Sequence, residues 1–304
     1  MSALTSGEEM DRTGNFVNLE LQKLGVWLRA NELAINTSKT KIMVFSNKKV
    51  LPAFDFVFNN NDPNSIEDPL LIKPLERITN SSLVPSIKML GVYLDEHLSF
   101  NFHCSKIVQK ISSAFYSINC AKHLLSKKSL KKLYFAMVHP HFLYCLPVYS
   151  FTSAKNINSL FKKQKQCIRV INKVKYNAHT EPLFFNSGIL PLEDLIVQQK
   201  LLFMHAIAYN YSAVKYEAFR SNTIATDRHY GLRNDNDFFV PRAYSSTVSK
   251  MPLVDFPLVW NNLDISLKDL VMKNNFKNTV KQQLLDKYVD FRCNRTVCYS
   301  CMNI

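Results

Sequence analysis

Between His97 and Thr180 the chain has no aspartate and no glutamate. The 24 basic residues outside this acid-free segment are balanced by the chain's 24 acidic residues, so the whole formal charge of +14 comes from the segment itself. A positive field this concentrated favours a polyanion, and nucleic acid is the commonest polyanion that a basic protein meets. The alternative interpretation is a set of solvated, lysine-rich helix faces. The segment contains fourteen basic residues: Lys106, Lys110, Lys122, Lys127, Lys128, Lys131, Lys132, Lys155, Lys162, Lys163, Lys165, Arg169, Lys173 and Lys175.

The sequence also has few glycines, no long apolar run and an odd number of cysteines, and each of these features excludes some classes of protein. The chain has only 6 glycines and no GxGxxG or Walker-type motif, which argues against a nucleotide cofactor held by a glycine-rich loop. No apolar run approaches the roughly 18 residues that span a bilayer, and the polar, acidic N-terminus resembles neither a signal nor a transit peptide. The seven cysteines are odd in number, which favours reduced thiols. We therefore expect an intracellular protein, nuclear or cytoplasmic, with no membrane partner.

Hydrophobic periodicity divides the chain into four parts. Residues 1–14 are expected to form a flexible leader. Residues 15–100 should contain a helix over 15–31, a strand over 40–45 and a strand or hairpin over 87–94. Residues 101–190 form the basic helical region, and 191–304 are helical and irregular, with 209–262 irregular and a last helix over 267–288. The expected fold class is α+β, with a small antiparallel sheet before residue 100 and helices after it. The inward face of the first helix is predicted to be Phe16, Leu19, Leu24, Trp27 and Leu28.

Helix signals are clear within the basic region. Ser126 and Ser153 are suited to cap two helices, and Pro140 should end or kink the first of them. On the second helix, spacings of three, four and four residues place basic side chains in one outward stripe about 16 Å long. This stripe consists of Lys162, Lys165, Arg169 and Lys173. Tyr116, Tyr134 and Tyr144 lie among the basic residues and could stack on bases or sugars, although their helical spacing is more typical of a core.

Two short blocks flank the predicted sheet. The first contains Trp27, Leu28, Asn31, Leu33, Asn36, Lys39, Thr40 and Phe45, and the second contains Lys88, Leu90, Gly91, Val92, Leu94 and Asp95. In order and spacing, and together with HTEPLFFNSGILPLEDL and VWNNLDISLKDL farther on, they resemble the C-terminal part of a non-LTR (LINE-type) retrotransposon reverse transcriptase. The first block resembles motif D and the second resembles motif E, the primer grip. The likeness covers about residues 15–290.

The resemblance implies a role for each part of the chain. Residues 15–100 would be a remnant of the palm, and 101–190 a thumb that lies along an RNA–DNA hybrid. Lys39 matches the motif D lysine near the incoming triphosphate, and Lys88 and Gly91 match the primer grip. The alternatives are a turn-closing surface lysine and a glycine packed under a helix. The strand over 42–45 is expected to pair with the strand over 88–94 or to remain an edge. Thumb contacts to the hybrid fall first to Lys162, Lys165, Arg169 and Lys173, and second to Lys127, Lys128, Lys131 and Lys132.

The chain departs from the family at the catalytic carboxylates. In the family, motif A and a YADD-like motif C hold two Mg²⁺ ions, but these 304 residues contain no Asp-Asp pair. We therefore expect a truncated, reverse-transcriptase-like chain that is inactive alone, with a vestigial Lys39 and with Mg²⁺ only in an intact parent polymerase. It would bind template–primer alone or docked on a separate chain that carries the catalytic palm. The alternative is a co-opted host protein that uses the helical region for protein or RNA interaction.

A weak metal signal lies near the C-terminus. Cys298 and Cys301 have half of the spacing of a zinc site, but no second pair follows them. They are retained only as weak candidates, and no metal is expected.

Overall fold

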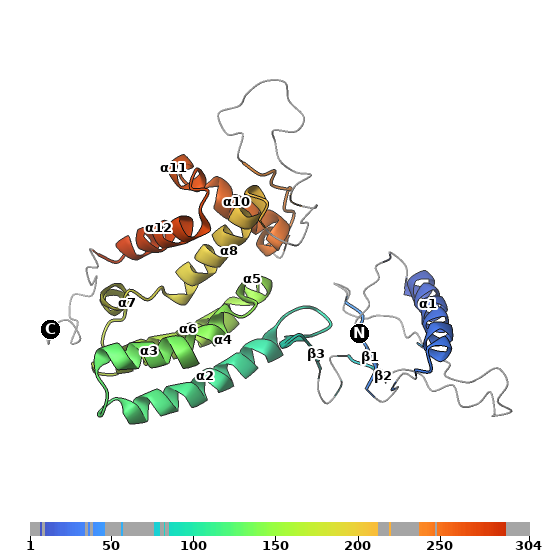
Figure 1. Cartoon of the computed structure of the whole chain (residues 1–304), viewed down its shortest axis with the longest axis horizontal. Helices are drawn as coiled ribbons and strands as arrows, with labels where there is room; N and C mark the ends of the chain where they lie inside the picture. Colours follow the sequence, from blue (N-terminus) through green and yellow to red (C-terminus); the bar gives the residue numbers. More distant parts are fainter. Residues whose placement is uncertain are drawn as a thin grey trace, which may run out of the picture. The chain divides into compact units, whose positions relative to one another are not determined.

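The computed structural model describes residues 10–33, 39–45, 76–79, 85–211, 237–246 and 248–289, together with the single residues 7, 36, 56, 82 and 219. The chain divides into two compact units, Met1–His103 and Cys104–Ile304, and most of the described residues are helical (Figure 1).

The first unit contains helix α1 (Met10–Ala30) and four short strands. They are β1 (Lys41–Ile42), β2 (Glu76–Arg77), β3 (Ile87–Met89) and β4 (Val92–Leu94). β3 and β4 form an antiparallel hairpin, as the sequence predicts. β1 instead pairs in parallel with β2, so the prediction that it pairs with the strand over 88–94 is wrong. The Lys41–Glu76 ion pair of 3.3 Å and the bond from the Ile78 N–H to the Ile42 carbonyl hold this alternative pairing, while β3 is satisfied by its own hairpin.

Helix α1 differs from the prediction in its start and in its buried face. It begins at Met10, so residues 10–14 are helical and not part of a flexible leader. Val17, Leu21 and Leu28 pack with Phe56 in the core of this unit. Of the predicted inward residues, Phe16, Leu19 and Trp27 are more than half exposed. The helix carries two apolar faces of helical spacing, and periodicity alone cannot choose between them.

The second unit is built from helices. Helix α2 (Asn101–Ala121) starts in the first unit and continues into the second. After it come α3 (Lys127–Met137), α4 (His139–Leu143), α5 (Leu146–Tyr149), α6 (Ala154–Asn172), α7 (Glu181–Ser187), α8 (Leu192–Ala208), η3 (Val248–Lys250), α10 (Pro252–Asn261), α11 (Ile265–Lys268) and α12 (Lys273–Asp286). The side chains of Ser126 and Ser153 accept bonds from the N–H groups of Ser129 and Asn156, which confirms both predicted caps. α3 ends before Pro140, also as predicted.

Helix α8 is the centre of this unit. It contacts α5 and α6 as well as α10 and α12 (Figure 1). Leu192, Leu195, Leu201, Met204 and Ile207 are buried along it. Because α8 is apolar on more than one side, it can bury the inner faces of the basic helices and of the C-terminal helices together.

Helix α10 contradicts the prediction that residues 209–262 are irregular. Pro252 occupies its first turn, where the missing N–H costs nothing, whereas Pro257 lies in its interior and leaves the Leu253 carbonyl without an intrahelical donor. Packing against α8 outweighs that loss. The rings of Phe256 and Phe203 lie 5.4 Å apart, and Lys200 pairs with Asp255 at 2.5 Å.

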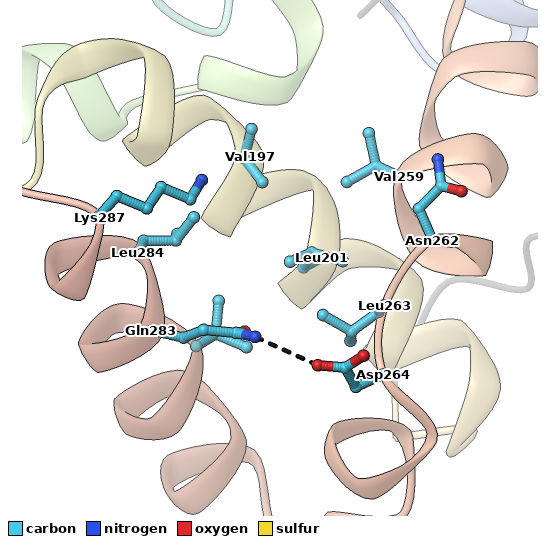
Figure 2. A pocket seen from close by; sticks show the side chains of 10 residues that line it. Val197, Leu201, Val259, Asn262, Leu263, Asp264, Gln283, Leu284 and Lys287 are labelled. Atoms are coloured by element: carbon cyan, nitrogen blue, oxygen red, sulfur yellow. Dashed lines mark hydrogen bonds between the residues drawn. The ribbon is translucent and has the colours of Figure 1, made fainter.

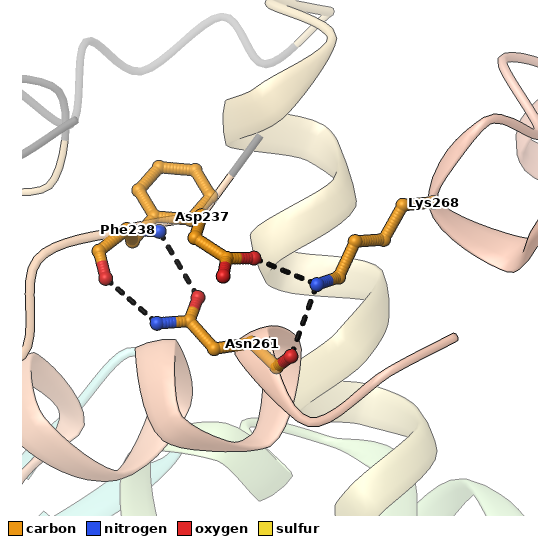
Figure 3. Close-up of polar contacts among 4 residues, drawn as sticks. All are labelled: Asp237, Phe238, Asn261 and Lys268. Carbon is orange, nitrogen blue, oxygen red and sulfur yellow. Dashed lines mark hydrogen bonds and ion pairs between the residues drawn. The ribbon is translucent and has the colours of Figure 1, made fainter. Parts of the chain in front are cut away.

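A buried ion pair joins the segment before η3 to α11 (Figure 3). The ammonium group of Lys268, a residue only 4% exposed, lies 2.7 Å from Asp237 and also donates to the Asn261 carbonyl at 3.0 Å. The Asn261 amide accepts from the N–H of Phe238 at 3.0 Å and donates to its carbonyl at 2.8 Å. Each of the four residues drawn takes part in at least one of these hydrogen bonds, and a buried charge is tolerated where it is paired in this way.

Removing one partner of this pair should unfold the second unit more easily. Lys268→Met leaves Asp237 as a buried charge without compensation, so we expect the free energy of unfolding to fall by about 3–5 kcal/mol. The double variant Asp237→Asn with Lys268→Met should recover a large part of that loss, and Lys250→Met, at an exposed position, should have little effect. Urea unfolding followed by circular dichroism measures all three. A loss below about 1 kcal/mol for Lys268→Met would contradict a buried, structural pair.

Candidate nucleic-acid interface

The β3–β4 hairpin ends in a tight two-residue turn. Leu90 and Gly91 have φ values of 47° and 88°, and two successive positive values are the mark of a type I′ turn. Gly91 is exposed at the tip, so it is not a glycine packed under a helix. Leu90 is 84% exposed in a backbone conformation that a leucine rarely adopts. Lys88 is exposed beside them, with its ammonium 5.8 Å from the centre of the Tyr93 ring.

Asp95 fixes the chain immediately after the hairpin. Its buried carboxylate accepts from the N–H and hydroxyl of Ser99 at 2.8 and 3.0 Å, and from the N–H of Phe100 at 2.8 Å. These bonds hold Leu98 and Phe100, which both have positive φ values, and lead the chain into α2. Asp95 therefore has a structural role, and its oxygen atoms are already occupied by hydrogen bonds.

The motif D-like block is a pair of backbone turns. Leu33 and Glu32 donate to the carbonyls of Leu28 and Arg29, which is a Schellman ending for α1. The Asn36 side chain accepts from the N–H of Lys39 at 3.1 Å. The Asn36 carbonyl accepts from the Thr40 hydroxyl at 2.9 Å. Lys39 closes a turn with its backbone and is exposed, as the structural alternative for this residue predicts.

The lysines of α3 and α6 differ in how much of each side chain is exposed to solvent. Lys127, Lys128, Lys132 and Lys162 are exposed, whereas Lys131 is half-buried. Lys173 lies just beyond α6, as its C-cap, and is also exposed. None of the exposed ones takes part in an ion pair among the residues that the structure describes.

Two members of the predicted stripe are partly structural. The Lys165 ammonium lies 4.2 Å from the centre of the Phe161 ring. The Arg169 side chain donates through Nε to the Ala178 carbonyl at 2.8 Å, and burial lowers the pKa of its guanidinium. The stripe is thus uneven, with Lys162 and Lys173 as its fully exposed ends.

Tyr116, Tyr134 and Tyr144 also differ in how deeply their side chains are buried. Tyr134 is fully buried and its hydroxyl accepts from the Gln164 amide at 3.0 Å, which confirms a core position and raises the pKa of the phenol through burial. Tyr116 and Tyr144 are 70% and 51% exposed, so for them the core interpretation is wrong. Both present an aromatic surface on the same unit as the exposed lysines.

One apolar cavity lies away from the basic helices (Figure 2). Its volume is about 520 Å³, and Val197, Leu201 and Leu284 contribute to its wall. Gln283 and Asp264, joined by a 3.4 Å hydrogen bond, and Lys287 add polar groups to the lining. An apolar group fits this wall, but the residues lining it show no acid–base pair placed for catalysis.

Among the described residues, no group of three His, Cys, Asp or Glu side chains is placed so that it could hold a metal ion. Cys298 and Cys301 lie outside the described residues. Among the described helices, none is both long and apolar enough to cross a bilayer.

Sequence reasoning missed a second row of lysines. Lys273, Lys277 and Lys281 recur every four residues on α12, outside the acid-free segment, where the basic and acidic residues of the chain balance. The charges of Lys281 and Lys277 act on His139 of α4, far away in the sequence. The regular spacing of these lysines was a signal in the sequence. It was overlooked because basic and acidic residues balance outside the acid-free segment.

The environment of His139 predicts a pH-dependent stability. Burial, and then the charges of Lys281 and Lys277, lowers the pKa of this imidazole to about 4, from 6.5 in an unfolded chain. A base with a lowered pKa in the folded state contributes full stability above pH 6.5 and loses it as pH falls towards 4. After discounting for partial exposure, we expect about 2 kcal/mol of this loss to disappear in His139→Gln. NMR titration of the ring measures the pKa directly, and a value of 6 or higher would contradict the structure.

Comparison of the chain with protein-family models, with curated proteins and with solved structures finds no match. The function is therefore argued from the residues and the geometry above.

Proposed function

We propose that this chain is a reverse-transcriptase-like protein of the non-LTR retrotransposon type, and that its helical region binds an RNA–DNA hybrid through the phosphates. The observation that carries the proposal is the acid-free segment, in which Lys127, Lys128, Lys132 and Lys162 are exposed on α3 and α6 and form no ion pair with a described residue. Contacts between such amines and phosphates neutralise charge and release counterions, and they carry no sequence information.

The arrangement of the helices supports a rigid basic surface. α3 and α6 contact each other and bury their apolar sides within the same unit. Lys127 and Lys128 occupy the first turn of α3, where the helix dipole adds to the positive potential. A surface held in this way can track a regular phosphate backbone, and the exposed Tyr116 and Tyr144 could add stacking on sugars or bases.

The hairpin supports the primer-grip part of the proposal. At the tip of the hairpin the backbone of Gly91 is exposed. Because glycine has no side chain, a nucleic-acid strand can approach the backbone closely there. Leu90 is held in a strained conformation that costs of the order of 1 kcal/mol, and such strain occurs most often at functional sites. Lys88 would supply a phosphate contact beside the turn.

A second candidate function rests on α1. Phe16, Leu19, Val26 and Trp27 are all more than half exposed, and they lie outside the Val17–Leu21–Leu28 face of the helix. An apolar face of this kind favours a protein partner, such as a separate chain that carries a catalytic palm or a host protein. This interaction function takes precedence if hybrid binding fails in the experiment below.

Polymerase activity is not expected from this chain alone. This sequence lacks the Asp-Asp motif that would hold the Mg²⁺ ions and so activate a primer hydroxyl. Primer extension on a poly(A)–oligo(dT) template with Mg²⁺ or Mn²⁺ should equal the protein-free blank. Extension that survives Lys39→Ala and depends on an acidic residue of this chain would show that the catalytic set has been misjudged.

Binding should show the salt dependence of phosphate contacts. We expect a Kd for an RNA–DNA hybrid of roughly 10⁻⁶ M or weaker at physiological salt, independent of base sequence. Replacing Lys127, Lys128, Lys162 and Lys173 together by glutamine should flatten the slope of log affinity against log salt by about three units, at about 0.7–0.9 per phosphate. Fluorescence anisotropy measures both quantities.

The matched control for this experiment neutralises exposed charges outside the acid-free segment. Arg242→Gln with Lys250→Gln should leave the salt slope nearly unchanged, since both residues are exposed and lie outside the acid-free segment, where basic and acidic residues balance. Losses proportional to charge in both variants would mean diffuse attraction without a docked helical surface. No loss in either variant would favour the protein-interaction function.

A further inference from the structure

Two lysines of α12 lie close enough to His139 for their charges to act on it, and one of them also feels the charge of Lys131 of α3. Lys281 of α12 feels the charges of Lys131 of α3 and of Lys277, its neighbour one turn earlier. His139, at the start of α4, feels the charges of Lys281 and Lys277. All four residues belong to the Cys104–Ile304 unit, so the fold itself brings them together. We refer to Lys131, Lys277 and Lys281 as the lysine cluster.

The cluster is mounted on packed elements. α12 packs against α7 and α8 (Figure 1), and the carbonyl of Lys277 accepts from the Gln198 amide of α8 at 3.1 Å, which fixes that part of α12. Lys131 is half-buried, and its ammonium would lie 3.8 Å from a Cβ atom added to Gly188, at the end of α7. The cluster is therefore set by helix packing.

His139 adds a polar group that the protein does not satisfy. Its ring lies 5.0 Å from the centre of the Phe135 ring and 6.0 Å from that of Tyr134, which hold it in place. Its Nδ1 atom is buried and makes no hydrogen bond with the described residues. A buried nitrogen that makes no hydrogen bond, near the ammonium groups of Lys277 and Lys281, is costly unless a further partner is present.

Three carboxylates on α7, α8 and α12, the helices that pack together here, have hydrogen-bond partners of their own. Glu181 of α7 accepts from the Thr180 N–H at 3.0 Å and faces Arg169. Asp286 of α12 accepts from the Gln282 amide at 2.8 Å, and Asp194 of α8 accepts from the Tyr288 hydroxyl. None of the three clustered lysines forms an ion pair with a described residue. Lys131 and Lys281 are half-buried, so the like charges of the cluster repel one another. No carboxylate among the described residues forms an ion pair that would offset this repulsion.

We infer that Lys131, Lys277 and Lys281 form an anion site that takes a phosphate group, with His139 beside it. Three ammonium groups carried by two helices suit an anion with several equivalent oxygens, and a single bound phosphate would offset the like-charge repulsion. Resting on the proposed function, the natural source is a backbone phosphate of the bound nucleic acid. The interface would then extend from α3 onto α12, beyond the acid-free segment.

The test uses the full chain and two variants of equal charge change. Lys277→Gln with Lys281→Gln removes two members of the cluster, and Arg242→Gln with Lys250→Gln is the control. The first arm adds inorganic phosphate at millimolar concentration and compares Tm with chloride at the same ionic strength. In the wild type and in the control, we expect phosphate to raise Tm by several degrees. It should also raise the pKa of His139, which NMR measures. Neither change is expected in the cluster variant. Without phosphate the cluster variant should melt at the same temperature as the wild type or higher, because repulsion is relieved.

The second arm measures affinity for the RNA–DNA hybrid and so identifies the source of the phosphate. A cluster that holds a backbone phosphate predicts a salt slope flattened by about 1.4–1.8 units in the cluster variant, with little change in the control. An unchanged slope together with a lost phosphate response would assign the site to free phosphate and overturn its place in the interface. A wild type that binds no hybrid would defeat the proposed function, while the first arm still decides the site. Equal phosphate responses in all three proteins would overturn the site itself.

Discussion

The second unit must hold together many positive charges in the acid-free segment that no acidic residue of that segment balances. The acid-free segment brings fourteen basic residues together with no carboxylate of its own, and helices that carry so many like charges do not associate through their outer faces. They stay together because their inner faces are buried. Leu130, Tyr134, Leu160 and Ile168 are fully buried on α3 and α6, and α8 provides the apolar surface that α6 contacts. Hydrophobic packing thus holds together a charged surface whose repulsion salt or a bound anion would reduce.

The residues that suggest a polymerase motif act mainly on the backbone in this structure. Asn36 and Asp95 accept backbone N–H groups around turns, and Asn31 donates from its side chain to the Trp27 carbonyl at 2.8 Å. These contacts explain why such residues are useful at these positions even in a chain that performs no chemistry. They shape the end of α1 and the approach to α2, whereas the hairpin tip and Lys127, Lys128 and Lys162 remain exposed.

Sequence reasoning succeeded where the signal is local. Caps at Ser126 and Ser153, the break at Pro140 and the hairpin over 87–94 depend on residues close together in the chain, and the structure has them all. It failed where tertiary packing decides. α1 has two apolar faces, α10 forms despite Pro257, and β1 pairs with a segment more than 30 residues away. The candidate site was found only in part for the same reason, because Lys277 and Lys281 approach Lys131 only in the folded chain.

Lysine footprinting by mass spectrometry tests the central claim most directly. The full chain is acetylated briefly with and without an RNA–DNA hybrid at low salt, and the reactivity of each lysine is compared. The account predicts protection of Lys127, Lys128, Lys162 and Lys173, joined by Lys277 and Lys281, while the exposed Lys250 keeps its reactivity. Uniform partial protection of all exposed lysines, or none at all, would contradict a defined nucleic-acid surface on this unit.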